Sequence, residues 1–179
     1  MYPFIRLAWQ FLINRNAPIL AVDATHVSQH ICLPTDIDLW WELNNGRTLT
    51  LYDLGRLPLA GRVGLLDTLK KNRWGLTMAG VSVRYRKRIR MWQRFEMRSR
   101  AVGYDSKFLY LEQSLWRNGD CCGHALYRSA VTDKNGLIPP HQVMQALGRP
   151  FDKPLPEWVQ AWIDADAHRP WPPMQDIPA

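Results

Sequence analysis

One apolar segment, residues 47–69, restricts the folds open to this chain more than any other feature. Its apolar side chains recur at helical spacing but cover more than one face, which is typical of a helix buried on most sides. Pro58 lies inside the segment and is expected to kink the helix or to reset its first turn. The fold must therefore enclose a long helix, and the rest of the chain has to supply the enclosing surface.

That surface is predicted to be a β-sheet, because hydrophobicity alternates with a period of two after residue 73. The short breaks between the alternating segments favour an antiparallel meander, in which the first two segments after the helix form a hairpin. The order of elements predicts the α+β class, with a sheet that curls around one helix. The predicted strands are residues 25–32, 74–88, 91–102, 107–117 and 122–132.

Composition divides the chain into an N-terminal helical segment (1–23), a central domain (24–135) and a proline-rich C-terminal helical appendage and tail (136–179). Charges interrupt the apolar run 1–22 too often for a membrane span or a secretory signal. Two interpretations of this run remain open. It is either a short helix packed on the domain or a surface helix in peripheral contact with a membrane.

The net charge of +7 arises between residues 84 and 100, which contain eight cations and one acid. In the rest of the chain the numbers of cations and acids are equal. Alternation places Arg84, Arg86 and Arg88 together on the outer face of the predicted hairpin. Three interpretations are open: a solvated face, a seat for the phosphates of a molecule such as coenzyme A, or a nucleic-acid surface. Few aromatic residues are interleaved, so nucleic acid is the least favoured partner.

Several kinds of functional site can be excluded because their sequence motifs are missing. The chain has no P-loop, no dinucleotide fingerprint and no nucleophile elbow. Cys121, Cys122 and His124 lack a further ligand at metal-binding spacing, and neither a metal site nor a cofactor is expected. Three cysteines do not form a disulfide framework, which favours a cytoplasmic location.

What remains is the loop 36–46 immediately before the long helix. It carries carboxylates and amides at a helix N-terminus, where free N–H groups can stabilise an anion while a carboxylate serves as base or nucleophile. This combination suits acyl chemistry. The polar residues of the loop are Asp36, Asp38, Glu42, Asn44 and Asn45.

The run Asp38-Leu39-Trp40-Trp41-Glu42-Leu43-Asn44-Asn45-Gly46-Arg47, followed by Asp53-Leu54-Gly55-Arg56, resembles the hotdog-fold acyl-CoA thioesterases. It looks closest to the branch related to hydroxybenzoyl-CoA thioesterase and to the thioesterase-superfamily member 6-like proteins. The resemblance covers about residues 25–133. It implies a five-stranded antiparallel sheet wrapped around the 47–69 helix, in a homodimer or a dimer of dimers with active sites between subunits.

The resemblance also implies roles for single residues. Asp38 falls on the position of the catalytic carboxylate, and Asn44 and Asn45 fall on the paired amides that end the loop. Asp53 matches an acid on the central helix, which is the catalytic carboxylate in other branches. The chain departs from the pattern at two positions, since Glu42 stands in place of a histidine and Trp41 in place of a glycine.

The function expected from these features is hydrolysis of an acyl-CoA or acyl-carrier thioester, with coenzyme A as part of the substrate and no separate cofactor. The alternative is a non-catalytic hotdog protein that binds acyl-CoA or acts as a structural partner, as the two departures would favour. The expected catalytic residues are Asp38, Glu42, Asn44, Asn45 and Asp53. The expected substrate-binding residues are Trp41, Gly46, Arg47, Arg84, Arg86 and Arg88.

Overall fold

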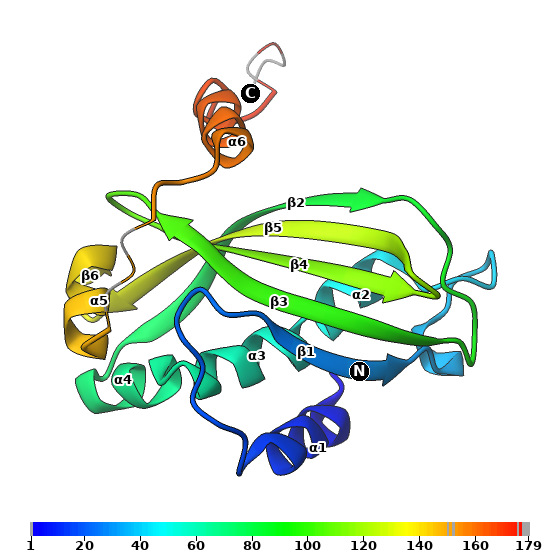
Figure 1. Cartoon of the computed structure of the whole chain (residues 1–179). Coiled ribbons are helices and arrows are strands. Elements are labelled where there is room, and N and C mark those ends of the chain that lie inside the picture. The colour runs from blue at the N-terminus through cyan, green and yellow to red at the C-terminus, as the bar shows by residue number, and fades with distance from the viewer. Residues whose placement is uncertain (1, 150, 152, 175, 177–179) are drawn as a thin grey trace.

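The structure, a computed structural model, describes residues 2–149, 151, 153–174 and 176. It consists of one curled antiparallel sheet with a line of helices inside the curl (Figure 1). The strand order is β1-β3-β4-β5-β2, with the short β6 paired to β5. The strands are β1 (His26–Ile31), β2 (Gly75–Tyr85), β3 (Arg94–Tyr104), β4 (Leu109–Arg117), β5 (Asp120–Asp133) and β6 (Gly136–Ile138). This confirms the α+β hotdog architecture.

Period-two alternation sorts the side chains between the two faces of the sheet as predicted. In β3, Phe95, Met97 and Ser99 are buried against the helices, whereas Arg94 and Arg98 face outward. Because each strand buries one of its two faces against the helices, its register is fixed by the need to keep the apolar set inside.

The predicted single helix over 47–69 is divided into three parts: α2 (Asn45–Leu51), α3 (Asp53–Arg62) and α4 (Leu65–Asn72). Tyr52 joins the first two in right-handed helical conformation, so they run on with little change of direction. The clear break falls at Gly64, where φ is +84°, and not at Pro58, which lies within α3. A left-handed backbone ends a helix, and glycine adopts it without steric cost.

The predicted hairpin between residues 74–88 and 91–102 is wrong. β2 pairs with β5 at one edge of the sheet, and β3 pairs with β1 and β4. The connection between them is not a tight turn, because its backbone bonds to other segments: the Ile89 carbonyl accepts from Leu43 N–H at 2.7 Å, and the Gln93 carbonyl accepts from Cys32 N–H at 3.0 Å. The basic residues of β2 and β3 are therefore separated by two strands.

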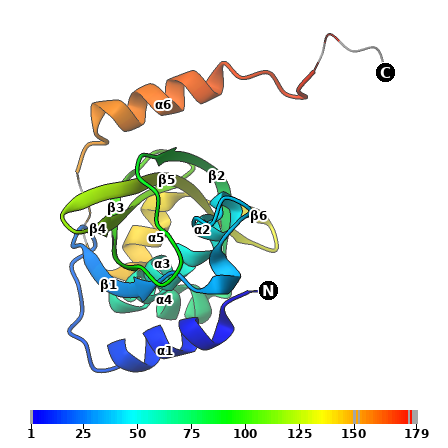
Figure 2. The same ribbon diagram turned by 90° about the vertical axis from the view of Figure 1, so that its right-hand side faces the viewer.

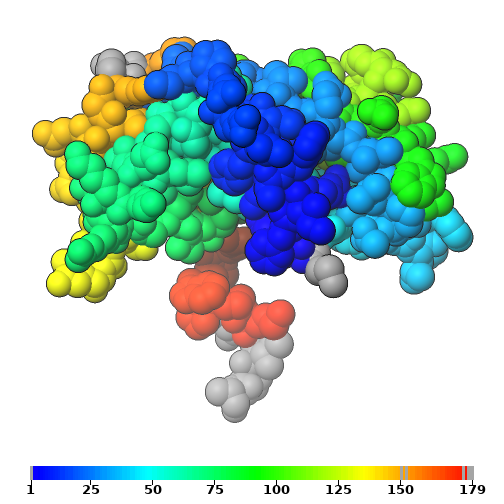
Figure 3. Space-filling view, turned by 90° about the horizontal axis from the view of Figure 1, so that it is seen from below, coloured from blue at the N-terminus to red at the C-terminus, as the bar shows by residue number. Residues whose placement is uncertain are grey.

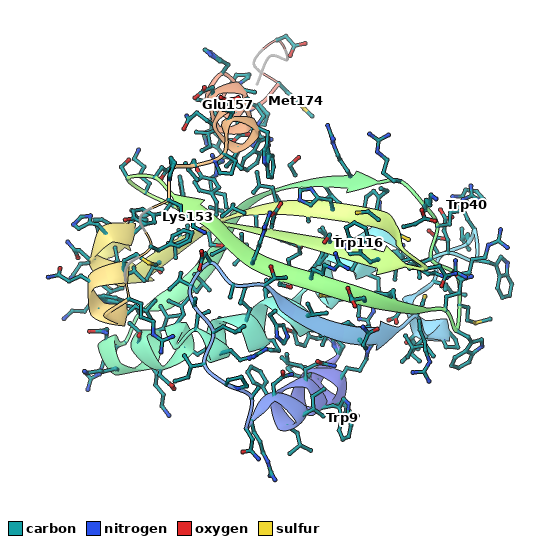
Figure 4. All side chains as sticks on the ribbon, in the orientation of Figure 1. Trp9, Trp40, Trp116, Lys153, Glu157 and Met174 are labelled. Carbon is teal, nitrogen blue, oxygen red and sulfur yellow. The ribbon has the colours of Figure 1, made fainter. Side chains whose placement is uncertain are left out.

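The N-terminal helix α1 (Phe4–Asn14) packs against α3, and in a view from below it lies across the helical layer (Figure 3). Its inward side is mixed: Leu7 packs against the core, Gln10 is buried, and Arg6 donates to Asp36 and to the Ile31 carbonyl. Its apolar side faces outward, with Trp9 pointing away from the domain (Figure 4). Among the described residues, none of the helices combines the length and hydropathy needed to cross a bilayer.

Two helices follow the sheet, α5 (Pro140–Leu147) and α6 (Glu157–Ala167). Helix α5 begins at Pro140, and Pro156 is the N-cap residue of α6. The 3-10 turn η1 (Pro34–Asp36) precedes the central loop. Helix α6 crosses the outer face of the sheet (Figure 2), where Val159 is buried with Tyr110 and Leu126. Within the predicted appendage and tail (136–179), positions 150, 152, 175 and 177–179 lie outside the described residues.

Candidate active site

The loop before the central helix folds back on itself as a small hairpin. Asp38 N–H donates to the Glu42 carbonyl at 2.9 Å, and Trp41 N–H donates to the Asp38 carbonyl at 3.1 Å. An isolated β-bridge pairs Ile37 with Leu43, and a second pairs Glu42 with Arg90. The two carboxylates Asp38 and Glu42 are thereby held at the two ends of one tight turn.

Asp36 anchors this turn to the rest of the domain. Its carboxylate is fully buried and lies 2.7 Å from Arg6 Nη1 and 2.6 Å from Arg47 Nε, and it accepts from Leu33 N–H at 3.0 Å. Burial alone would raise the pKa of Asp36, but the Leu33 hydrogen bond and the guanidinium groups of Arg47 and Arg6 outweigh it and hold that pKa below its usual range. Arg47 therefore belongs to a structural ion-pair cluster.

The two asparagines serve the start of the helix. Asn44 Oδ1 accepts from Arg47 N–H at 2.9 Å, which is an ordinary N-cap contact. Asn45 Oδ1 accepts from Gly46 N–H at 2.6 Å. The N–H groups of Gly46 and Arg47, two residues expected to bind substrate, thus already have side-chain acceptors, whereas Asn45 N–H has no acceptor within the described part of the chain.

A groove of about 560 Å³ opens between this loop and the end of β2. One wall contains Asp38, Glu42, Asn44, Asn45 and Thr48, and the other is the segment 85–89. Asp38 Oδ1 accepts from Trp40 N–H at 2.8 Å, which fixes the carboxylate in position while Oδ2 has no hydrogen-bond donor among the described residues. The groove therefore gathers four of the five predicted catalytic residues.

Two of the predicted arginines, Arg86 and Arg88, line the groove, and Lys87 lies between them. Arg88 Nε lies 2.7 Å from Glu42 Oε2 as an ion pair without hydrogen-bond geometry, and Lys87 Nζ lies 2.7 Å from Asp120 Oδ2. Arg84 is exposed and does not line the groove, because in its register with His124 it faces the outer side of the sheet.

The two tryptophans of the turn have different positions. Trp41, predicted to contact substrate, is exposed with φ of +60° and does not line the groove. Its neighbour Trp40, which the sequence did not single out, is a lining residue. The left-handed backbone at Trp41 is the conformation that a glycine at this position would adopt without strain.

Asp53 lies apart from the groove, about 12 Å along the helix axis from Asn45 at 1.5 Å per residue. Its carboxylate accepts from the Tyr2 hydroxyl at 2.9 Å and pairs with Arg56 Nη2 at 2.5 Å. The Arg56 guanidinium in turn lies over the Tyr127 ring, 4.5 Å from its centroid. Gly46, like Asp53, is not a lining residue.

The groove also includes residues that sequence reasoning missed. Tyr85, whose hydroxyl donates to the Asn45 carbonyl at 3.2 Å, links the end of β2 to the helix start. Thr48 lies one helical turn beyond Asn44 and could have been found from that spacing. Cys122 and Gly123 come from β5, and no local signal connects them with the loop.

The described residues contain no group of three or more His, Cys, Asp or Glu side chains that could hold a metal. Cys122 lines the groove, and burial raises the pKa of its thiol. His124 faces the other side of the sheet, with Nε2 at 2.9 Å from Glu112 Oε2. The local Cys-Cys-x-His run is therefore divided between the two faces of β5.

A second, apolar cavity of about 100 Å³ lies between α3 and the inner face of the sheet, farther along the central helix. Its lining includes Leu57, Ala60, Leu76, Met78, Leu111 and Met144. The polar groove and the apolar cavity lie along the same helix, one beside its beginning and the other beside the second half of α3.

Residues 32–163 match the family described as Thioesterase-like superfamily. The chain is 32% identical over 162 residues to Protein THEM6 of Xenopus laevis, covering 89% of this chain and 78% of the relative. It is 27% identical over 139 residues to Protein THEM6 of Drosophila melanogaster, covering 75% of this chain and 70% of that relative.

Solved structures show the same fold at low sequence identity. The probable thioesterase YbaW from Escherichia coli superposes with a TM-score of 0.64 at 15% identity, covering 68% of this chain and 96% of its own. The DHNA-CoA thioesterase from Staphylococcus aureus gives 0.60 at 12% identity, covering 80% and 91%.

Proposed function

Because the chain belongs to the thioesterase-like superfamily, we propose that it hydrolyses an acyl-CoA or acyl-carrier thioester in the groove at the start of the central helix. The observation that carries this proposal is the position of Asp38. Its carboxylate lies in a polar groove beside Asn44 and Asn45, opposite a wall that contains Arg86 and Lys87. The groove thus combines a carboxylate for the reaction with cations for phosphates.

Asp38 acts in one of two ways. As a nucleophile, its free oxygen attacks the thioester carbonyl, the carbon–sulfur bond breaks, and the thiolate leaves and takes a proton; water then cleaves the resulting anhydride. As a general base, Asp38 takes a proton from the attacking water, and the thiolate leaves with a proton in the same manner. Both routes yield a carboxylic acid and a thiol and need no cofactor.

The oxyanion is stabilised at the N-terminus of α2. Asn45 N–H is the first candidate, because it has no acceptor among the described residues. Gly46 N–H can join it once the Asn45 side chain, exposed to solvent, rotates away. Arg47 N–H remains with Asn44 and supports the helix start. The oxyanion is thus held by the N–H groups of Asn45 and Gly46, and Arg47 N–H takes no part because it is bonded to Asn44.

The coenzyme's phosphates are assigned to the wall formed by Arg86, Lys87 and Arg88. Glu42 holds Arg88 by an ion pair and so controls how much positive charge this wall presents. In this role Glu42 replaces the histidine of the family pattern with a charge partner, and it does not act directly on the thioester.

A non-catalytic acyl-CoA binder is the second candidate function. The Glu42–Arg88 ion pair favours it, because a charged pair stands where the family pattern has a histidine. The two candidates are distinguished by incubating the purified protein with acyl-CoA substrates of different chain lengths. Release of free thiol supports hydrolysis, whereas tight binding without thiol release supports the binder.

We also propose that two copies associate and that the protein works in the cytoplasm. β2 is an edge strand of the sheet, and its exposed side chains Val81 and Tyr85 are available to a second copy. A partner at this edge would lie beside the groove, since Tyr85 is a lining residue. All three cysteines are unpaired, which suits a reducing compartment.

A further inference from the structure

The turn of the central loop exposes large apolar side chains at one end of the molecule. Leu39, Trp40 and Trp41 are 88%, 73% and 67% exposed, and Trp92 is 58% exposed. The label of Trp40 marks this end in Figure 4, far from helix α6. We call these four residues the aromatic tip. Monomeric soluble proteins rarely expose neighbouring apolar groups of this size without a partner.

The backbone holds the tip in place. The bridge between Glu42 and Arg90 puts the turn 38–41 beside residues 91 and 92, and Trp92 N–H donates to the Cys32 carbonyl at 2.7 Å. Trp41 and Trp92 both have left-handed backbones, with φ of +60° and +64°. Bulky residues seldom adopt this conformation, and here it accompanies the exposure of two indole rings.

Positive charge accompanies the tip. The segment 86–90 contains four cations, Arg86, Lys87, Arg88 and Arg90, and no acid. Lys87 is paired with Asp120 and Arg88 with Glu42. Within the described residues, Arg86 and Arg90 form no ion pair. The neighbouring acids are Asp120, Glu42 and Asp38. The four cations of segment 86–90 therefore exceed these three acids by one positive charge beside the apolar rings.

We propose that the aromatic tip docks on the surface of an anionic lipid membrane. Indole rings favour the headgroup layer of a bilayer, where the apolar ring is buried and the N–H stays wet, and nearby cations are attracted to anionic lipids. The neighbouring positive charge distinguishes this occupant from an uncharged apolar partner.

Docking there would also place the groove next to the membrane, because Trp40 belongs to both the tip and the groove lining. The substrate would then be an amphiphilic thioester whose acyl chain resides in the bilayer. This second step rests on the proposed function, whereas membrane docking does not.

The test is co-sedimentation of the full chain with vesicles of phosphatidylcholine, with and without phosphatidylserine. The tip variant Leu39→Ser/Trp92→Asn changes two residues that do not line the groove, and asparagine tolerates the left-handed backbone at position 92. The matched control, Ile5→Ser/Trp9→Gln, removes one aliphatic and one tryptophan side chain from the exposed face of α1.

We expect binding that requires phosphatidylserine, falls at least about tenfold in the tip variant and is retained in the α1 variant. Arg90→Gln should lower it about fivefold, since each cation near an anionic surface contributes a factor of this size. Loss in the α1 variant with none in the tip variant would overturn the proposal in favour of peripheral contact through residues 1–22. Absence of vesicle binding by the wild type, or dissociation of an oligomer by the tip variant, would overturn it too.

Two further measurements separate docking from catalysis. The tip variant should hydrolyse a short-chain, water-soluble acyl-CoA like the wild type. Asp38→Asn, which removes one of the neighbouring acids, should bind vesicles at least as well as the wild type. Wild-type vesicle binding without any thioester hydrolysis would leave the docking site standing while rejecting the proposed function.

Discussion

Glu42 Oε2 and Arg88 Nε lie 2.7 Å apart across the mouth of the candidate active site. The pair joins the loop that carries Asp38 to the basic wall that follows β2. The state of this ion pair should therefore affect substrate binding more than the chemical step.

Replacing Glu42 by glutamine should lower KM for an acyl-CoA about two- to fivefold and leave kcat nearly unchanged, because the Arg88 charge becomes available to the phosphates and exposed ion pairs are weak. Steady-state kinetics measures this. Glu96→Gln is the matched control, since Glu96 forms a similar 2.7 Å pair with Arg98 on the outer face of the sheet. A fall in kcat with unchanged KM would instead assign Glu42 to the reaction.

Asp36→Asn should destabilise the fold by about 3 kcal/mol, because it leaves Arg6 and Arg47 without their shared, fully buried counter-charge. Urea unfolding followed by circular dichroism gives this value. Asp23→Asn, which loses only an exposed pair with Lys153, should stay within about 0.5 kcal/mol of the wild type. Equal stability of the two variants would contradict a structural role for Asp36.

Two glycines of α3 should respond to alanine in opposite directions. A Cβ at Gly55 would lie 2.5 Å from Ser99 Oγ and 2.6 Å from Met97 Sδ, so Gly55→Ala should destabilise the protein by about 1–3 kcal/mol. At Gly61 the nearest atoms are at 3.6 Å, and Gly61→Ala should stabilise by up to about 1 kcal/mol through helix propensity. Thermal unfolding of both variants checks the pair. A neutral Gly55→Ala would mean that α3 is not packed tightly on β3.

Acid should weaken the fold before the carboxylates titrate. Burial, with Arg62 nearby, lowers the pKa of His26 to about 4, and burial with Arg6 and His26 lowers the pKa of His30 to about 3. Both imidazoles are neutral in the folded protein and take up protons more readily when unfolded. Stability is therefore complete above about pH 6.5 and falls with pH below it, by up to about 1.4 kcal/mol per unit for each histidine.

The free energy of unfolding measured against pH checks this slope. His30→Gln should flatten the slope by up to about 1.4 kcal/mol per unit. His168→Gln, a substitution of the same type at an exposed site, is the matched control. An unchanged slope in His30→Gln would show that this histidine is not buried in its neutral form.

Local patterns predicted the strands and the enclosed helix because burial imposes a period on each element separately. They failed to predict which strands pair with each other. Nothing within residues 74–102 reveals that β2 pairs with β5, since alternation is satisfied equally by either partner. The sequence predicted a kink at Pro58, but the helix tolerates this proline and breaks at Gly64 instead.

For the candidate site too, the residues close together in sequence were predicted and the contacts between distant segments were not. Asp38, Asn44 and Asn45 were found because they are close in sequence to the helix start. Arg47 was misplaced because its partner Asp36 is also held by Arg6, thirty residues away from it. Trp40 and Trp41 could not be told apart, since only the left-handed backbone at Trp41 decides which ring reaches the groove.

In the proposed mechanism Asp38, and not Asp53, carries out the reaction. The most direct measurement compares thiol release from an acyl-CoA by the wild type, Asp38→Asn and Asp53→Asn. We predict that Asp38→Asn lowers kcat at least about 100-fold with little change in KM, whereas Asp53→Asn retains most of the activity. Undiminished hydrolysis by Asp38→Asn, or a larger loss in Asp53→Asn, would contradict the catalytic role of Asp38.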